Sequence, residues 1–189
     1  MNMPAQDELH DPGCRMKRPM PPGVDGSALL TGENRENPVT LSRAWGDALL
    51  DEKAPYSLWI RMNPSGADAD RYDLTTPKEG EWTQRLGLCR YVKVNVGNYR
   101  STDPAGLDRA ACVSHPRNLP TIILSALVAK LVILTTGRPP EILVPHARTL
   151  FRELKRAGIK PLCLSVARGG WPKHSSRLGY DTPMVEFAL

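Results

Sequence analysis

Strand-like and helix-like segments alternate along this chain, and that alternation constrains the fold more than any other feature. Short apolar runs rich in β-branched or aromatic residues predict strands, and the segments between them have helical periodicity. We predict strands at 56–62, 91–96, 131–136 and 161–166, helices at 79–88, 119–130 and 145–157, and a short first helix that Thr40 or Ser42 caps and Leu50 ends. Such alternation implies right-handed crossovers, so we expect an α/β protein, a three-layer α/β/α sandwich with a central, mostly parallel four-stranded sheet.

The N-terminal segment lacks this pattern. It is rich in Pro and Gly, and only 28–30 is appreciably apolar. Because such a segment buries too little surface to offset the entropy of ordering it, we predict a disordered tail over residues 1–37. The alternative is a docking contact through Leu29 and Leu30. A single α/β domain then spans residues 38–189, a usual size for one domain.

The charge and the apolar runs limit the class of protein. Lys and Arg number 25 against 20 Asp and Glu, and the net charge of +5 favours polyanionic partners, although an ordinary basic surface gives the same value. No apolar run approaches the roughly 18 residues that cross a bilayer, and the first residues do not resemble a secretory signal. We therefore expect a soluble, cytoplasmic monomer without membrane association. The four cysteines form no C-x-x-C pair, so we expect neither a metal nor a cofactor.

A polar loop follows the first predicted strand, at the edge of a parallel sheet where ligands bind. The amide of Asn63 is suited to hold a water or a polar ligand atom, and Ser65 is a second candidate ligand contact. The alternative is that Asn63-Pro64 only ends the strand. Asp68 and Asp70 follow as general bases, metal ligands or solvated acids, and the sequence does not decide among these.

The loop after the second strand contains an Asn and an Arg. Asn95 stands in an apolar run, and a buried Asn must find partners or costs about 1–3 kcal/mol. Its amide both donates and accepts, which suits the edge of a base, but it equally suits a neighbouring loop. Arg100 either grips a phosphate or carboxylate of a ligand or pairs with Asp103.

The loop after the fourth strand combines cations, hydroxyls, two glycines and a Trp. His174 is the best candidate for stabilising charge or donating a proton, against the alternative of a surface His. Trp171 either stacks on a base or caps the core, and Ser175 is a candidate ligand contact. The glycines permit close approach of the backbone to a ligand. The candidate phosphate contacts are Arg168, Lys173 and Arg177.

Three strings resemble, in order and spacing, the motifs of the uncharacterised family DUF1643. They are LWIRMNPSGAD at 58–68, VNVGNYRSTDP at 94–104 and GWPKH at 170–174. The resemblance covers about residues 41–187. The family name implies no activity.

The chain also resembles, more distantly, the uracil-DNA glycosylase superfamily, which has a four-stranded parallel sheet. Asn63-Pro64, Asn95 with Arg100, and the string that begins at His174 fall where that superfamily has its motifs. The resemblance implies that Asn63 positions the attacking water, Asn95 reads a pyrimidine edge and His174 stabilises the leaving base. Arg177 or Leu178 would then fill the gap left by a flipped nucleotide.

The chain departs from the glycosylase pattern in two places. The Gly-Gln-Asp-Pro-Tyr motif with its catalytic Asp is absent, and Arg61 and Met62 stand where small residues normally flank the pocket. His174 is followed by Ser175 instead of Pro. The leading hypothesis is a glycosylase-like protein, a possible DNA N-glycosylase, that recognises and excises a modified pyrimidine in DNA rather than RNA. The alternatives are a non-catalytic reader of modified bases and an enzyme acting on a free nucleotide or another small phosphorylated ligand.

Overall fold

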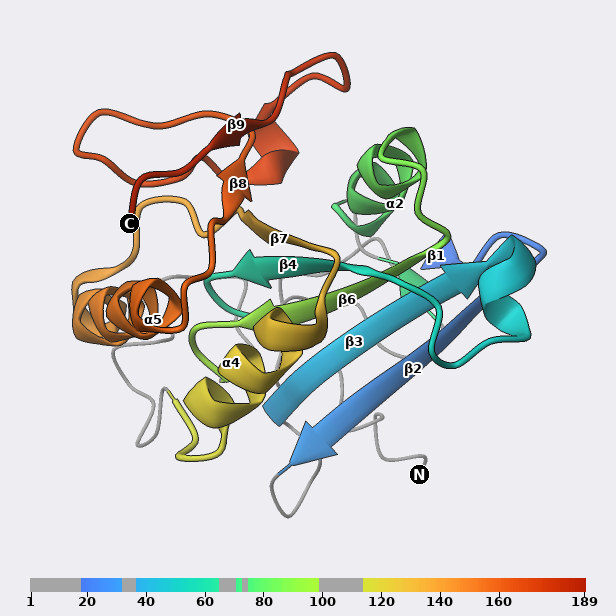
Figure 1. Ribbon diagram of the computed structural model, residues 1–189, viewed down its shortest axis with the longest axis horizontal. Helices are drawn as coiled ribbons and strands as arrows, with labels where there is room; N and C mark the ends of the chain where they lie inside the picture. Colours follow the sequence, from blue (N-terminus) through green and yellow to red (C-terminus); the bar gives the residue numbers. More distant parts are fainter. Residues whose placement is uncertain (1–17, 32–36, 65–70, 73–74, 99–113) are drawn as a thin grey trace, which may run out of the picture.

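The computed structural model describes residues 18–31, 37–64, 71–72, 75–98 and 114–189, and a seven-stranded mixed sheet lies at its centre (Figure 1). In their order across the sheet, the strands are β2 (Val24–Thr31), β3 (Asn37–Trp45), β6 (Arg90–Asn95), β4 (Ser57–Arg61), β7 (Leu131–Leu134), β8 (Leu162–Cys163) and β9 (Val185–Glu186). The α-helices are α2 (Thr76–Arg85), α4 (Asn118–Val128) and α5 (Val144–Arg156). Short 3-10 turns are η1 (Gly46–Leu49), η2 (Glu141–Leu143) and η3 (Ser175–Arg177), and β1 (Arg18–Pro19) pairs with β5 (Arg71–Tyr72).

The α/β class is confirmed, and the four strands predicted from the sequence are neighbours. β6, β4, β7 and β8 pair in parallel. The sheet is wider than the four strands expected, because β2 and β3 extend it on one side and β9 on the other, all antiparallel. Helix α2 is three residues earlier than predicted at both ends. Its start has Pro at the first turn, and Gly87 follows its end with a φ of 73°.

The N-terminal predictions differ from the structure. Val24–Thr31 is strand β2, so this part of the predicted tail belongs to the sheet, and the predicted Thr40 or Ser42 helix is instead strand β3. An edge strand is held by backbone hydrogen bonds to its neighbour, so β2 needs no apolar periodicity of its own. In β3 the buried side chains alternate, as Leu41 and Arg43 show, and this period belongs to a strand. Residues 1–17 and 32–36 lie outside the described residues.

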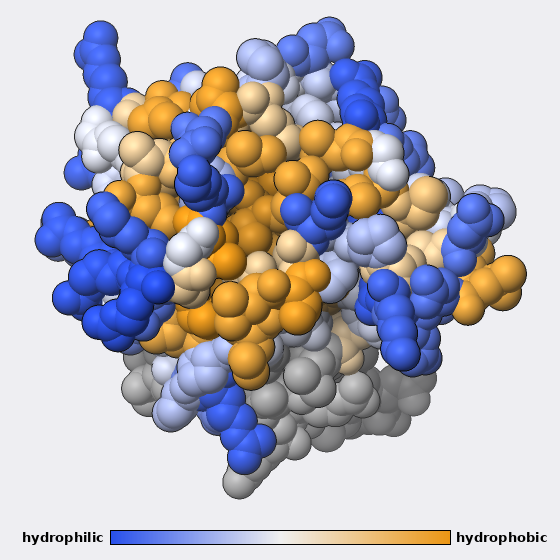
Figure 2. Space-filling model, viewed as in Figure 1, coloured by the Kyte–Doolittle hydropathy of each residue, from blue (hydrophilic) through white to orange (hydrophobic). Residues whose placement is uncertain are grey.

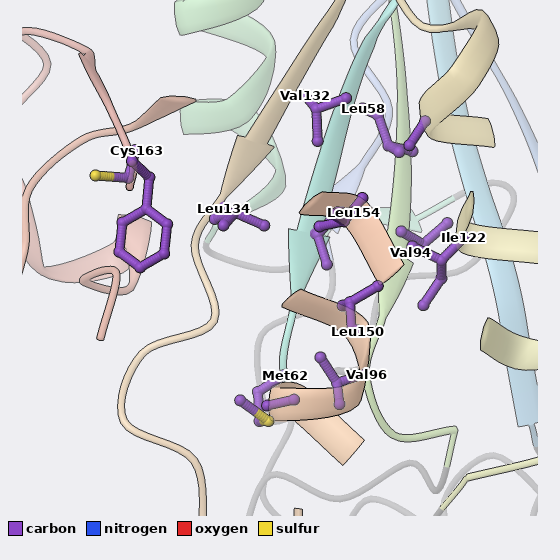
Figure 3. Packing of buried hydrophobic residues seen from close by; sticks show 14 of the residues in the cluster. Leu58, Met62, Val94, Val96, Ile122, Val132, Leu134, Leu150, Leu154 and Cys163 are labelled. Atoms are coloured by element: carbon purple, nitrogen blue, oxygen red, sulfur yellow. The ribbon is translucent and has the colours of Figure 1, made fainter. Parts of the chain in front are cut away.

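The two faces of the sheet bury different residues, because successive side chains of a strand point to opposite faces. Leu58 and Ile60 of β4 join a large apolar cluster under α4 and α5, which Figure 3 shows in part. Trp59, between them, joins a smaller cluster with Trp82 of α2. Helices therefore cover both faces of the parallel strands.

The outer side of α4 is apolar. Leu124, Leu127 and Val128 are 65%, 55% and 72% exposed. Figure 2 shows apolar residues gathered over this part of the molecule. No helix of the described residues has the length and hydropathy needed to cross a membrane.

Candidate functional site

A cleft of about 770 Å³ lies where three loops leave the carboxyl ends of parallel strands. Met62 and Asn63 follow β4, residues 136–140 follow β7, and residues 167–178 follow β8. We call it the cationic cleft. Its lining residues are Met62, Asn63, Thr136, Gly137, Arg138, Pro140, Ala167, Lys173, His174, Ser176, Arg177 and Leu178.

The lining of the cleft carries charge of one sign. Arg138, Lys173 and Arg177 are all exposed, and none of the described lining residues is a carboxylate. Cations that converge on one concave surface raise the local concentration of anions and bind phosphate or carboxylate oxygens well. The arrangement therefore favours an anionic ligand.

His174 stands in the wall of the cleft, and Arg61 determines which of its ring nitrogens carries the proton. Arg61 Nη2 lies 2.9 Å from His174 Nε2, and a guanidinium only donates, so Nε2 accepts. The proton then lies on Nδ1, which donates to Ser176 Oγ at 2.7 Å. The Ser176 backbone N–H lies 3.2 Å from the same nitrogen, but the contact with Arg61 decides, since a guanidinium cannot accept. In this arrangement His174 is neutral.

Arg61 connects the cleft to a buried polar cluster under α2. Its Nε lies 3.5 Å from Oε1 of Glu79, and Lys93 Nζ lies 3.8 Å from Oε2 of the same carboxylate. Lys93 also donates to Thr76 Oγ1 at 3.1 Å, and Ser175 Oγ lies 3.4 Å from Glu79 Oε1. The side chain of Glu79 is fully buried and those of Arg61 and Lys93 are 5% exposed. A carboxylate buried between two cations can hold Arg61 in a fixed orientation towards His174.

Two further buried polar groups flank Arg61 at the sheet edge. Asn95 ends β6 and Thr135 directly follows β7, the strands on either side of β4. Asn95 Oδ1 and Thr135 Oγ1 are buried, and neither has a hydrogen-bond partner among the described residues. Such groups are rare in native proteins and call for an explanation.

The order of these loops can be compared with known families. The family model described as a protein of unknown function, DUF1643, matches residues 39–175. The chain belongs to the DUF1643 family. The match begins in β3, spans the strands that carry Asn63 and Asn95, and includes His174. No curated protein and no solved structure matches the chain.

Several site residues predicted from the sequence come together in this DUF1643 protein. Asn63, Lys173, His174 and Arg177 line the cationic cleft. Asn95 does not line it, and instead lies buried on β6, beside Arg61. Ser65, Arg100, Asp68 and Asp70 lie outside the described residues.

Other predicted site residues do not reach the cleft. Ser175 is fully buried against Glu79, and Arg168 is exposed elsewhere. Trp171 packs against Phe151 of α5, with ring centroids 5.7 Å apart, so capping the core describes it better than stacking on a base.

The two glycines of that loop form a reverse turn. Gly169 and Gly170 have φ of 91° and 79°, and the Ala167 N–H donates to the Trp171 carbonyl at 2.8 Å. The bend aligns Val166 with Pro172. The left-handed conformation that the turn requires explains these glycines without a ligand.

The sequence interpretation of the DUF1643 chain missed Arg61, Glu79 and Arg138 as site residues. One signal for Arg61 and Lys93 was present, because each interrupts an otherwise apolar strand with a charge. A buried charge needs a buried partner, so these two positions indicate a polar cluster. Glu79 gives no such signal, since a Glu in the first turn of a helix is common.

The described cysteines and acids offer no nucleophile or metal site. Burial raises the pKa of the Cys163 thiol, which favours the unreactive protonated form. Cys89 is exposed and does not line the cleft. No group of three or more metal-binding side chains occurs among the described residues.

Proposed function

We propose that the cationic cleft binds the phosphates of a DNA strand and that the protein recognises a pyrimidine base there. The observation that carries the proposal is that Asn63 and His174 share one cleft with Arg138, Lys173 and Arg177, with no carboxylate among the described lining residues. Positive charge supplies affinity for the phosphates, and the amide and imidazole supply recognition.

The arrangement of the strands supports the comparison with glycosylases. Helices on both faces of parallel strands are compatible with the three-layer α/β/α sandwich of that superfamily, and we extend the comparison to activity. In the proposed reaction a water held by Asn63 attacks the sugar carbon of the N-glycosidic bond. The bond to the base breaks, its electron pair stays on the base, and the water loses a proton to solvent. The protein contributes positioning and electrostatic stabilisation.

The contact between Arg61 and His174 modifies the role that the resemblance implies for His174. Nε2 accepts from Arg61 and has no proton to offer to a leaving base. Negative charge on the base is therefore stabilised by the Arg61–His174 pair, in which Arg61 provides the positive charge. Removal of one preorganised donor typically lowers the rate about 10²–10³-fold, so His174→Ala and Arg61→Ala should lower turnover more than binding.

Salt dependence tests the proposal directly. We would measure the affinity for single-stranded and duplex oligonucleotides as salt is raised, with Lys173→Ala and Arg177→Ala. Each variant should reduce the slope of log affinity against log salt by about 0.7–0.9 for every phosphate that the removed cation neutralised. Arg156→Ala is the matched control, because Arg156 is an exposed cation at the end of α5 and does not line the cleft. A slope unchanged by both cleft variants would refute phosphate binding in the cleft.

Base release tests the catalytic part. Oligonucleotides that carry uracil or modified pyrimidines are incubated with the protein, and free base is measured by mass spectrometry. Release by wild type that His174→Ala suppresses supports a glycosylase. Binding with no release from any of these oligonucleotides indicates a non-catalytic reader.

The size of the cleft supports a second candidate, an enzyme acting on a free nucleotide or another small phosphorylated ligand. A volume of about 770 Å³ lies within the range of about 300–1,000 Å³ that is usual for small-ligand sites. Competition separates the two candidates. A free pyrimidine nucleotide that binds at least as tightly as an oligonucleotide favours the small-ligand enzyme, and weak nucleotide binding favours DNA.

A further inference from the structure

Asn95, Arg61 and Thr135 lie level with one another on three adjacent strands. Arg61 pairs with Asn95 in the parallel register of β4 and β6, and Ile60 pairs with Leu134 of β7. The ladder continues one residue further, since the Thr135 N–H donates to the Ile60 carbonyl at 2.9 Å. With strands about 4.8 Å apart, the row spans about 10 Å.

The alternation of the strands places the row on the α2 face. Tyr91 and Ile133 belong to the cluster on that face, and Asn95 and Thr135 have the same parity in their strands. Arg61 reaches from the middle of the row to His174 in the wall of the cleft. The row therefore lies one side chain behind the cationic cleft.

Burial without a partner gives the outer two members of the row a cost and no visible return. Asn95 is 6% exposed and Thr135 is fully buried, yet Oδ1 and Oγ1 make no hydrogen bond among the described residues. Neighbouring hydroxyls behave differently. Thr83, equally buried on the same face, bonds with Ser57 Oγ, Trp59 Nε1 and the Glu79 carbonyl. The contrast indicates that the two orphan oxygens await an external partner.

We propose that Thr135, together with Asn95, determines which base the protein accepts, by hydrogen bonding to the polar edge of the base. The Asn95 amide and the Thr135 hydroxyl can each donate and accept, as the adjacent N–H and C=O groups of a pyrimidine edge require. The inference rests on the proposed binding of DNA and adds Thr135 as a specificity residue. Discrimination follows because a base that lacks the matching groups leaves both oxygens unpaired.

The substitution Thr135→Val tests this inference, since it exchanges the hydroxyl for a methyl group of the same shape. A hydroxyl that lacks a partner in the free protein contributes nothing to folding, so the variant should melt at or above the wild-type temperature. Thr83→Val is the matched control. It removes a bonded hydroxyl and should lower the melting temperature by several degrees, about 2–4 °C for each kcal/mol of destabilisation.

The binding readout uses single-stranded oligonucleotides that are identical except at one position, which is uracil, thymine, cytosine or an abasic site. A 2′-fluoro sugar at that position resists cleavage of the glycosidic bond. Wild type should prefer one base over the abasic site. Thr135→Val should weaken binding of that base by about 3- to 10-fold, the effect of removing one hydrogen bond, and leave abasic affinity unchanged.

The possible failures are distinguishable. Wild type that binds no oligonucleotide, or binds every base like the abasic site, refutes the proposed base recognition. Wild type that discriminates while Thr135→Val discriminates equally overturns only the role of Thr135. A loss of stability in Thr135→Val as large as that in Thr83→Val also overturns it, because the hydroxyl would then be structural. Retained stability with weaker discrimination supports the inference.

Discussion

The two faces of the parallel strands are built from different residues. Under α4 and α5 every buried strand residue of the cluster is apolar, as Leu58 and Val94 illustrate. Under α2 the same strands carry Arg61, Lys93 and Asn95, all buried. A buried apolar side chain stabilises at any position that it fills, whereas a buried charge requires a particular partner in a particular place. One face therefore supports the fold, and the other holds side chains in set positions next to the cleft.

The largest effect that would sharpen this comparison is expected from Glu79→Ala. The substitution leaves the buried cations Arg61 and Lys93 without their shared carboxylate and should destabilise the protein by about 3–5 kcal/mol in denaturant unfolding. The matched control is Glu81→Ala, on the same helix, where an exposed pair with Arg85 contributes about 0.3–0.5 kcal/mol. Similar losses in the two variants would contradict the polar cluster.

The apolar face should respond next, and without any effect on ligand binding. Leu150→Ala in α5 removes a side chain that is 1% exposed and should cost about 2–5 kcal/mol, close to 3 where the site relaxes partly. Leu124→Ala, on the exposed side of α4, should change stability by less than about 0.5 kcal/mol. DNA affinity at a temperature where both variants are folded should equal that of wild type. Weakened DNA binding in Leu150→Ala alone would show that the two faces are not separate in function.

The sequence predicts the apolar half of this comparison well and the polar half poorly. Buried parallel strands are continuous apolar runs, so β4, β6 and β7 are recognisable from composition alone. The edge strand β2 is VDGSALLT, and its pairing with β3 depends on backbone hydrogen bonds that leave little trace in side-chain type. Long-range pairing explains why part of the predicted tail is a strand.

The same limit applies to the candidate site. Asn63 and His174 could be predicted to meet because both follow parallel strands, and topology brings such ends to one edge. Which neighbours surround them could not be predicted. The contact of Arg61 with His174 joins residues 113 positions apart, and the burial of Ser175 depends on where Glu79 of α2 lies. Side-chain pairing across distant loops is not encoded in spacing.

A smaller effect is expected where the two faces meet the cleft, at His174. His174→Ala removes the acceptor of a hydrogen bond from the Arg61 guanidinium and should destabilise the free protein by about 1.5–3 kcal/mol. His174→Gln offers an amide oxygen in its place and should recover part of this loss. In a double-mutant cycle with Arg61→Met, the coupling should be of the same order. A coupling near zero would mean that the contact does not fix the protonation of His174.

The smallest effect should come from Trp171→Leu, which asks whether the loop after β8 belongs to the apolar face or to the cleft. Trp171 packs on Phe151, and Phe151 packs in turn on Phe187, with ring centroids 5.5 Å apart. An aromatic pair contributes about 0.5–1.5 kcal/mol beyond the area that it buries, and Leu keeps part of that area. We therefore expect a loss of stability of about 1 kcal/mol with unchanged affinity for every oligonucleotide. Base stacking predicts the opposite result, weaker binding by about 1–3 kcal/mol at full stability, and would return Trp171 to the ligand.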